Sequence, residues 1–209
     1  MPTSDVRLPV DVQGYSMRPT MEKAEMNEKS VLVVLAQGCE ELEAVTCIDL
    51  LRRANIEVVI AGLDRNPVVA SRKTTLVPDT TLDQAMKRSF DMIVLPGGLP
   101  GADNLAGDPR VIDLLKKMAS ESKFTCAICA APTVLAKAGI LSGKRATGYP
   151  GTLDKMNMPN VTYTGEAVSR DGNVITSRGP GTAIDFALEL VEALAGRKSR
   201  EQVEKSLVR

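Results

Sequence analysis

"FTCAICAAP", residues 124–132, is a short apolar run followed by a turn of small residues and a proline. Such a run, bounded by turn residues, is typical of a buried strand, and proline is favoured in the first turn of a helix. The stretch therefore predicts a strand over 124–129, a tight turn, and a helix over 132–137 that Gly139 ends.

The same alternation of strand and helix continues on both sides of this stretch. Repeated β-α-β order predicts an α/β fold with a mostly parallel sheet and helices on both faces. Thr182 and Asp185 have the spacing of a capping box at the start of the last helix. Strands are expected at 30–36, 57–63, 91–98 and 173–181 (the last with its turn), helices at 40–54, 109–121 and 182–196, and a small hairpin at 68–78.

The composition indicates a globular protein without a strongly charged partner. A chain of 209 residues suits one domain with a sizeable core. Lys+Arg and Asp+Glu are both 26, so neither nucleic acid nor a membrane surface is expected as a partner. No apolar run approaches the ~18 residues of a membrane span. Four cysteines are too few for a disulfide scaffold, which favours a reducing, cytoplasmic location.

Residues 1–29 differ from the rest of the chain. They mix Pro, Gly, Asp, Lys and Glu without a sustained periodicity, and they lack the apolar core of a secretory signal. We therefore expect a peripheral N-terminal extension or leader over 1–29 and a single domain over 30–209.

The sequence contains no histidine. This excludes Cys–His and Ser–His catalysis, and it removes most zinc sites, which would otherwise need all four cysteines. Proton transfer near neutral pH must instead use Glu, Asp, Tyr, Cys or Lys. We expect no metal and no cofactor.

The reactive site of an open α/β sheet lies beyond the carboxyl ends of its strands. Three segments are expected to arrive there, "QGCEELE" (37–43), "PGG" (96–98) and "CAAP" (129–132). The glycines supply backbone N–H groups that can face a developing oxyanion, or they simply form a tight turn.

The opening stretch holds two cysteines in a C-x-x-C spacing. On a strand, Cys126 and Cys129 would have Cα atoms ~10 Å apart, which is too far for a disulfide. Cys126 is interpreted as a small buried residue. Cys129 lies at a strand-to-helix turn, where unpaired N–H groups lower the pKa of a thiol. From this stretch alone, Cys129 is equally well interpreted as a nucleophile or as another core residue.

Glu40, Glu41 and Glu43 fall in the first turn of the first expected helix. Favourable charge at a helix N-terminus explains most such clusters. The alternative is that one carboxyl faces Cys129, stays protonated beside the thiolate and serves as a general acid.

Four segments together resemble the ThiJ/PfpI superfamily, in the branch of the parkinsonism-associated protein deglycase (DJ-one). The resemblance runs from about Ser30 to about Val208. It implies a flavodoxin-like three-layer sandwich and a homodimer that pairs through the first helix. The segments are "LAQGCEELEAVTCIDLLRRANIEVVIAGL", "DMIVLPGGLPGADNL", "CAICAAPTVLA" and "ITSRGPGTAIDFALELVEALAG".

The resemblance also implies roles for individual residues. The nucleophilic, oxidisable cysteine of the family matches Cys129, and its protonated partner matches Glu43. Further implied site residues are the backbone donors Gly98 and Ala130, and Arg53 and Arg72 in the substrate pocket or the dimer contact.

Tyr149 departs from the family pattern, because many relatives have a histidine before this proline. Tyrosine is a poor base at neutral pH but can donate a hydrogen bond, so Tyr149 either orients substrate or is a wall of the pocket. Cys47 is expected in a helix core, and Cys39 is either an exposed, modifiable thiol or a neutral replacement. Arg178 is expected to serve the turn or the dimer.

These observations favour a cysteine-dependent glyoxalase and protein deglycase. It would act on methylglyoxal, glyoxal or early glycation adducts, release lactate or glycolate, and protect against carbonyl and oxidative stress. The alternative is a redox sensor or chaperone in which Glu43 stabilises the sulfinate of Cys129. A cysteine peptidase or amidase is disfavoured because no histidine is available to protonate an amine leaving group.

Overall fold

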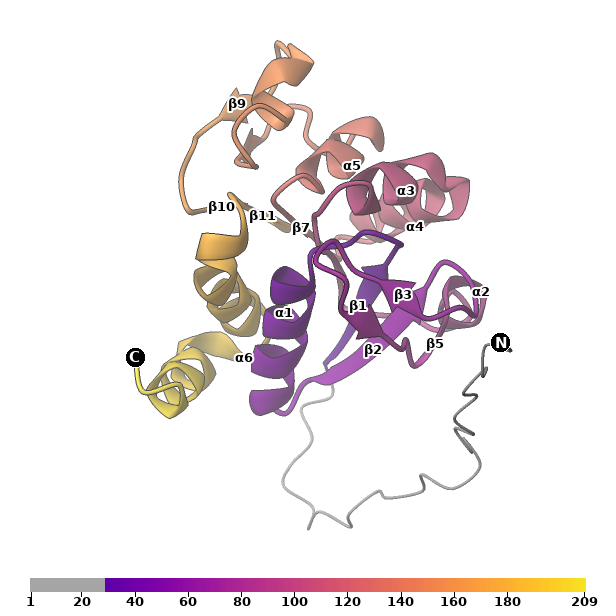
Figure 1. Ribbon diagram of the computed structural model, residues 1–209. Helices are drawn as coiled ribbons and strands as arrows, with labels where there is room; N and C mark the ends of the chain where they lie inside the picture. The colour runs from indigo at the N-terminus through magenta and orange to yellow at the C-terminus, as the bar shows by residue number, and fades with distance from the viewer. Residues whose placement is uncertain (1–28) are drawn as a thin grey trace, which may run out of the picture.

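The computed structural model describes residues 29–209, and within them a seven-stranded sheet forms the centre of the molecule (Figure 1). Every neighbouring pair of strands is parallel except the edge pair of β10 and β11. From edge to edge the sheet is β10 (Val168–Asp171), β11 (Val174–Ser177), β7 (Phe124–Ile128), β6 (Met92–Leu95), β1 (Ser30–Leu35), β2 (Glu57–Gly62) and β5 (Thr80–Thr81).

Helices cover both faces of this sheet, as expected (Figure 1). The central strand β1 shows why, since Val31 and Val33 pack with α1 and α6 whereas Leu32 and Val34 pack with the helices of the other face. A strand that is buried on both faces has a continuous apolar run in its sequence. The helices are α1 (Glu41–Arg53) and α6 (Ala183–Ser206) on one face, and α2 (Leu82–Ala85), α3 (Gly101–Gly107), α4 (Pro109–Ser120) and α5 (Pro132–Lys137) on the other.

The strand order places the carboxyl ends of β1, β6 and β7 side by side. β1 lies between β2 and β6, with Val31 opposite Val58 on one side and Met92 on the other. Chain order therefore reverses between β1 and β6. In open α/β sheets such a reversal opens a crevice for ligands beyond the strand ends.

Several elements lie outside the sequence-based expectation. The hairpin expected at 68–78 is present as β3 (Val68–Val69) and β4 (Thr75–Leu76). A further small sheet joins β8 (Arg145–Ala146) to β9 (Thr162–Tyr163). The short elements that were not expected have two to seven residues each, too few for a periodic pattern to identify. They are α2, α3, β5, β8, β9, β10 and the 3₁₀ turns Leu153–Met156 and Pro180–Thr182.

The last helix confirms one prediction and corrects another. Its first segment ends at Gly196, as expected, because the φ of 81° there is left-handed and not helical, and a second helical segment follows to Ser206. The capping box of Thr182 and Asp185 is wrong. The Thr182 hydroxyl donates to the carbonyl oxygen of Gly179 at 2.9 Å instead of capping α6.

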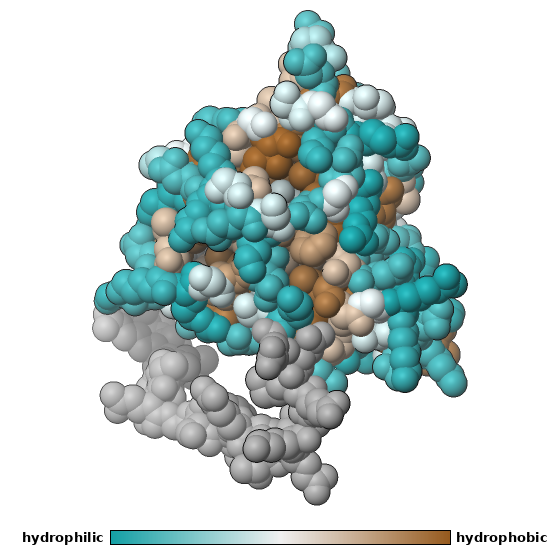
Figure 2. Space-filling model, turned by 180° about the vertical axis from the view of Figure 1, so that it is seen from behind, coloured by the Kyte–Doolittle hydropathy of each residue, from teal (hydrophilic) through white to brown (hydrophobic). Residues whose placement is uncertain are grey.

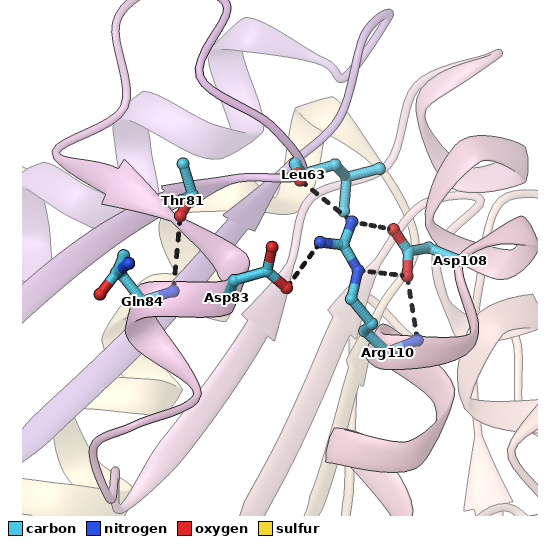
Figure 3. Close-up of polar contacts among 6 residues, drawn as sticks. All are labelled: Leu63, Thr81, Asp83, Gln84, Asp108 and Arg110. Carbon is cyan, nitrogen blue, oxygen red and sulfur yellow. Dashed lines mark hydrogen bonds and ion pairs between the residues drawn. The ribbon is translucent and has the colours of Figure 1, made fainter.

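Arg110 holds the helical layer of α2–α5 against the end of β2 (Figure 3). Its guanidinium donates to the Asp83 carboxylate at 2.8 Å, to the carbonyl oxygen of Leu63 at 3.0 Å, and to both oxygens of Asp108. Asp108 also caps α4 by accepting from the Arg110 N–H. One side chain thus ties α2, α4 and the end of β2 together.

Seen from behind, the surface is mostly hydrophilic, with hydrophobic residues set among polar ones (Figure 2). In the part of the chain that is described, no helix combines the length and the apolar character needed to cross a membrane. The extension predicted over 1–29 lies outside the described residues except for Lys29. The carbonyl oxygen of Lys29 accepts from the Glu57 N–H, and its amine pairs with Asp91.

Candidate active site

Cys129, Gly97 and Glu43 meet at the carboxyl-terminal edge of the sheet. Cys129 directly follows β7, Gly97 comes two residues after β6, and Glu43 lies in the first turn of α1, which follows β1. The Gly97 N–H donates to Oε2 of Glu43 at 2.7 Å. A side chain on Gly97 would collide with Cys129, because an added Cβ would lie 2.6 Å from the Cys129 Cβ. The three expected segments therefore come together in one place.

The backbone of Cys129 is held in an unusual conformation. Its φ of 65° is left-handed, which is rare for residues other than glycine and costs about 1–3 kcal/mol. Its N–H donates to the carbonyl oxygen of Ser177 at 2.9 Å, and its carbonyl oxygen accepts from the Tyr149 N–H at 2.8 Å. Neighbouring segments on both sides thus fix a sharp strand-to-helix turn that directs the thiol to the sheet edge.

Glu43 is a fully buried carboxyl group with one unpaired oxygen. Oε2 accepts from Gly97, whereas Oε1 has no hydrogen-bond partner of good geometry among the described residues. Burial raises the pKa of Glu43 to about 7, despite the opposing hydrogen bonds from the Gly97 N–H and the Cys129 thiol. A carboxyl oxygen in this position is best accommodated with a proton on it, and the adjacent sulfur is the acceptor at hand.

The Cys129 thiol does not behave as the sequence predicted. Burial, and next the charge of Glu43, raise its pKa to about 12, although the backbone N–H groups of Gly98 and Ala130 face the sulfur and lower the pKa. The expected lowering by a helix N-terminus is therefore wrong while Glu43 is ionised. The physical reason is that burial of the thiol and the nearby Glu43 charge outweigh the backbone N–H groups of Gly98 and Ala130 at this turn.

Glu43 and Cys129 must be considered as one titrating pair. The charge of Glu43 no longer raises the thiol pKa once Glu43 carries the proton, and burial alone then opposes the Gly98 and Ala130 N–H groups, which lower that pKa. Between about pH 7 and about pH 12 the pair holds one negative charge. Transfer of one proton from the Cys129 thiol to the Glu43 carboxylate would present a thiolate beside a neutral acid.

The other two glutamates of the cluster serve the fold. Ser71 donates its hydroxyl to Glu40 at 2.7 Å, and the N–H groups of Arg72 and Thr74 donate to Glu41. Although partial burial opposes it, these backbone hydrogen bonds lower the pKa of Glu41 to about 2. Both carboxylates hold the β3–β4 hairpin against the start of α1.

The remaining cysteines are buried and unbridged. All four thiols are free, so the C-x-x-C spacing forms no disulfide. Cys126 and Cys47 are completely buried, as expected, and burial raises the pKa of both thiols. The interpretation of Cys39 as an exposed thiol is wrong, because Gly101 packs against it and no part of it reaches solvent. Cys129 alone of the four reaches solvent, with 8% of its surface exposed.

The predicted pocket residues are spread more widely than the pair itself. Tyr149 is 50% exposed and next to Cys129 through its backbone. Arg72 is exposed on the hairpin that Glu41 holds. Arg53 ends α1, ten residues and about 15 Å beyond Glu43, and pairs with Asp49. Arg53 therefore does not line the pocket of its own chain, and its role in a dimer contact stays a prediction.

Two features of the site were missed from the sequence. The sequence pointed to Gly98 as an oxyanion donor but did not indicate that the neighbouring Gly97 N–H donates to Glu43. The Ser177 and Thr182 hydroxyls, which lie 2.7 Å apart, join the strand end beside Cys129 to the start of α6. "SRGPGT" at 177–182 carried this signal, but it was interpreted only as a turn. Within residues 29–209, no group of three or more Cys, Asp or Glu side chains is arranged to hold a metal ion.

Known proteins resemble the chain over most of its length. The sequence profile of the DJ-1/PfpI family matches residues 29–193. Protein dj-1beta of Drosophila melanogaster is 47% identical over 182 residues, covering 86% of this chain and 97% of that protein. Its crystal structure matches the fold over the same shares with a TM-score of 0.83.

Two further relatives extend the comparison. The Parkinson disease protein 7 homolog of Danio rerio is 45% identical over 88% of this chain and 98% of its own. In Caenorhabditis elegans, the glutathione-independent glyoxalase DJR-1.2 is 38% identical over 86% of this chain and 96% of its own. Because the family profile matches residues 29–193 and these relatives are matched over nearly their whole lengths, the chain belongs to the DJ-1/PfpI family.

Proposed function

We propose that this protein is a cofactor-independent glyoxalase and protein deglycase. The observation that carries the proposal is the buried Glu43 carboxyl beside the Cys129 sulfur, which also faces two backbone N–H groups. A nucleophile, a proton donor and oxyanion donors are the parts that addition to an aldehyde requires. The relative from Caenorhabditis elegans that is named a glyoxalase supports the same activity here.

The reaction begins when the Cys129 thiolate attacks the aldehyde carbon of R–CO–CHO. A C–S bond forms, and the carbonyl electron pair moves onto oxygen, where the Gly98 and Ala130 N–H groups and the proton of Glu43 neutralise it. The Glu43 carboxylate then removes the hydrogen on the aldehyde carbon as a proton and returns it to the neighbouring carbon, giving a thioester. Water cleaves the thioester to R–CH(OH)–COO⁻ and a proton, and Cys129 is released. Methylglyoxal gives lactate and glyoxal gives glycolate.

The deglycase activity uses the same chemistry on an early adduct. An aminocarbinol between methylglyoxal and an amine releases the amine when Cys129 takes over the carbonyl carbon. Glu43 supplies the proton that the leaving amine needs, in place of the absent histidine. Such an activity would protect against carbonyl stress in the cytoplasm.

A homodimer that pairs through α1 accompanies this proposal. Leu42 and Val45, at three-residue spacing on the outer face of α1, are 49% and 48% exposed. Apolar side chains gathered on one exposed helix face favour contact with a second copy. Arg53, at the end of the same helix, would then lie in the contact.

A redox sensor is the second candidate function. Cys129 is the thiol that reaches solvent, and a protonated Glu43 can donate to a sulfinate oxygen as well as to a thiolate. A chaperone activity would depend on the same oxidation. Catalysis and sensing therefore share Cys129 and Glu43, and only turnover separates them.

The test is methylglyoxal consumption with quantified lactate. We expect wild type to form lactate in step with methylglyoxal loss and Cys129→Ser to form none above background. Cys39→Ala is the matched control, since Cys39 is a buried thiol in the neighbouring turn and should leave turnover near wild type. Equal lactate formation by wild type and Cys129→Ser would refute the glyoxalase proposal and leave sensing as the better account.

A further inference from the structure

A cavity of about 490 Å³ opens beside the candidate active site. It is lined by Tyr149, Pro150 and residues 178–182. These two segments also hold the peptide groups of Cys129. The Tyr149 N–H donates to the Cys129 carbonyl oxygen, and the Cys129 N–H donates to the carbonyl oxygen of Ser177, the residue before Arg178. The cavity therefore adjoins the backbone of Cys129, on the side where both segments meet.

The walls of this cavity are rigid and partly apolar. The Tyr149 ring lies against Gly179, where an added Cβ would be 3.2 Å from the ring carbon Cδ2. Two prolines and the Thr182 hydroxyl, which is bonded to Ser177 and Gly179, fix the backbone around it. A preformed cavity with an aromatic wall is typical of a small-molecule subsite.

The size of the cavity exceeds what methylglyoxal needs. Pockets of about 300–1,000 Å³ hold ligands far larger than a three-carbon aldehyde. The reacting aldehyde carbon must lie at the Cys129 sulfur, so the cavity is free for a part of the substrate that does not react.

The charge of the cavity indicates what that part carries. Arg178 is exposed, and no carboxylate is among the lining residues. One guanidinium nitrogen of Arg178 donates to the carbonyl oxygen of Gly165 at 3.2 Å, which serves the turn as expected. Within residues 29–209 Arg178 has no ion pair, and a guanidinium has five N–H donors. The remaining donors can bind a carboxylate through two parallel hydrogen bonds.

We propose that this cavity is an anion subsite, in which Arg178 selects α-oxoaldehydes and their amine adducts that carry a carboxylate. The proposal rests on the glyoxalase function and names its substrate class. A suitable substrate is 4,5-dioxopentanoate, which takes up water at Cys129 and Glu43 to give 2-hydroxyglutarate and a proton. Its methyl ester offers the same reacting group without the charge.

The kinetic test compares the acid with its methyl ester. In wild type we expect kcat/KM for the acid to be at least about 10-fold higher than for the methyl ester, mainly because KM is lower for the acid. A pair of charge-assisted hydrogen bonds would give a difference of this size. Arg178→Gln should reduce the ratio to about one, and Arg178→Lys should retain part of it because the charge remains. Arg145→Gln is the matched control, since Arg145 is an exposed arginine already paired with Glu166, and it should keep the wild-type ratio. Equal kcat/KM for acid and ester in wild type, or a ratio that survives Arg178→Gln, would overturn the subsite.

A binding measurement separates this proposal from the proposed function. We expect calorimetry to detect 2-hydroxyglutarate binding to wild type that is tighter than lactate binding and is lost in Arg178→Gln but not in Arg145→Gln. If wild type binds in this way yet turns over no methylglyoxal, the subsite stands and the glyoxalase function fails. If wild type converts methylglyoxal but binds 2-hydroxyglutarate no better than Arg178→Gln does, the function stands and the subsite is refuted.

Discussion

The cavity beside Cys129 and a cavity beyond β1 and β2, both at the carboxyl-terminal edge of the sheet, differ in how completely the polar groups near them are paired. The larger, of about 520 Å³, lies beyond β1 and β2 next to the Arg110 network. There the guanidinium donates to two carboxylates and a carbonyl oxygen (Figure 3). The smaller cavity adjoins the strained backbone of Cys129, whose thiol lies beside the Glu43 carboxyl, and one oxygen of that carboxyl has no hydrogen-bond partner within residues 29–209.

The comparison teaches that volume alone does not locate the chemistry. A satisfied ion-pair network lowers the free energy of the fold and leaves no group poised to react. A buried acid with a raised pKa beside a thiol costs folding free energy and is kept where it is used. Substitutions in the Glu43–Cys129 pair and in the Arg110 network therefore test the two sides of this contrast.

The largest expected effect is on turnover by Glu43→Gln. Glutamine keeps the size of the side chain and can still hydrogen-bond, but it cannot transfer the proton. Because general acid–base catalysis is worth ~10²–10⁴-fold, we expect methylglyoxal turnover to fall at least ~10²-fold while peroxide still oxidises Cys129. Lactate formation and mass spectrometry of the oxidised protein are the two measurements.

Glu40→Gln is the control for this substitution. Glu40 lies three residues earlier and accepts from the Ser71 hydroxyl, which a glutamine side chain can also do. Its effect on turnover should be several-fold at most. If Glu43→Gln turns over methylglyoxal like wild type, Glu43 does not move the proton, and the role of the pair in sensing becomes the better explanation.

The strand-to-helix pattern was sufficient to predict the sheet, its two helical layers and the edge where the site lies. The strands β1, β2 and β6, which pack on both faces, carry continuous apolar runs, and this signal needs no tertiary information. The short elements and the extension of α6 past Gly196 were missed because they depend on contacts with distant segments.

Within the site, residue types were predictable and pairings were not. The cluster of Glu40, Glu41 and Glu43 gave three candidates. Only the hairpin that Glu40 and Glu41 hold, and the Gly97 N–H that meets Glu43, distinguish them. The thiol pKa was predicted with the wrong sign because local position suggested a helix terminus, whereas burial and Glu43 dominate. Such balances depend on packing that sequence spacing does not express.

A second prediction concerns the pH dependence of stability. Glu43 has an ordinary pKa of 4.5 when unfolded and about 7 when buried, so the unfolded chain loses its proton first as pH rises. The favourable contribution is complete below about pH 4.5 and is lost as pH rises to about 7. A difference of this size corresponds to about 3 kcal/mol of unfolding free energy.

Denaturant titrations of wild type and Glu43→Gln at several pH values measure this contribution. Subtracting the variant removes the opposite trend of carboxylates with lowered pKa, such as Asp91 and Asp108. We expect the stability of wild type relative to Glu43→Gln to decline between pH 4.5 and about 7 and then stay level. A difference independent of pH would mean that Glu43 is ionised throughout, and the neutral acid of the mechanism would be lost with it.

The smallest expected effect is from Arg110→Gln, on the other side of the contrast. The substitution removes the ion pairs to Asp83 and Asp108 on a partly exposed side chain, while Asp108 keeps its cap on α4 through a backbone N–H. Charge-assisted hydrogen bonds of this kind predict a loss of about 1–2 kcal/mol in unfolding free energy. Methylglyoxal turnover, measured well below the unfolding transition, should match wild type, because the paired groups of this cavity take no part in the chemistry. Turnover reduced tenfold in a variant of near-wild-type stability would show that the larger cavity also contributes to the reaction.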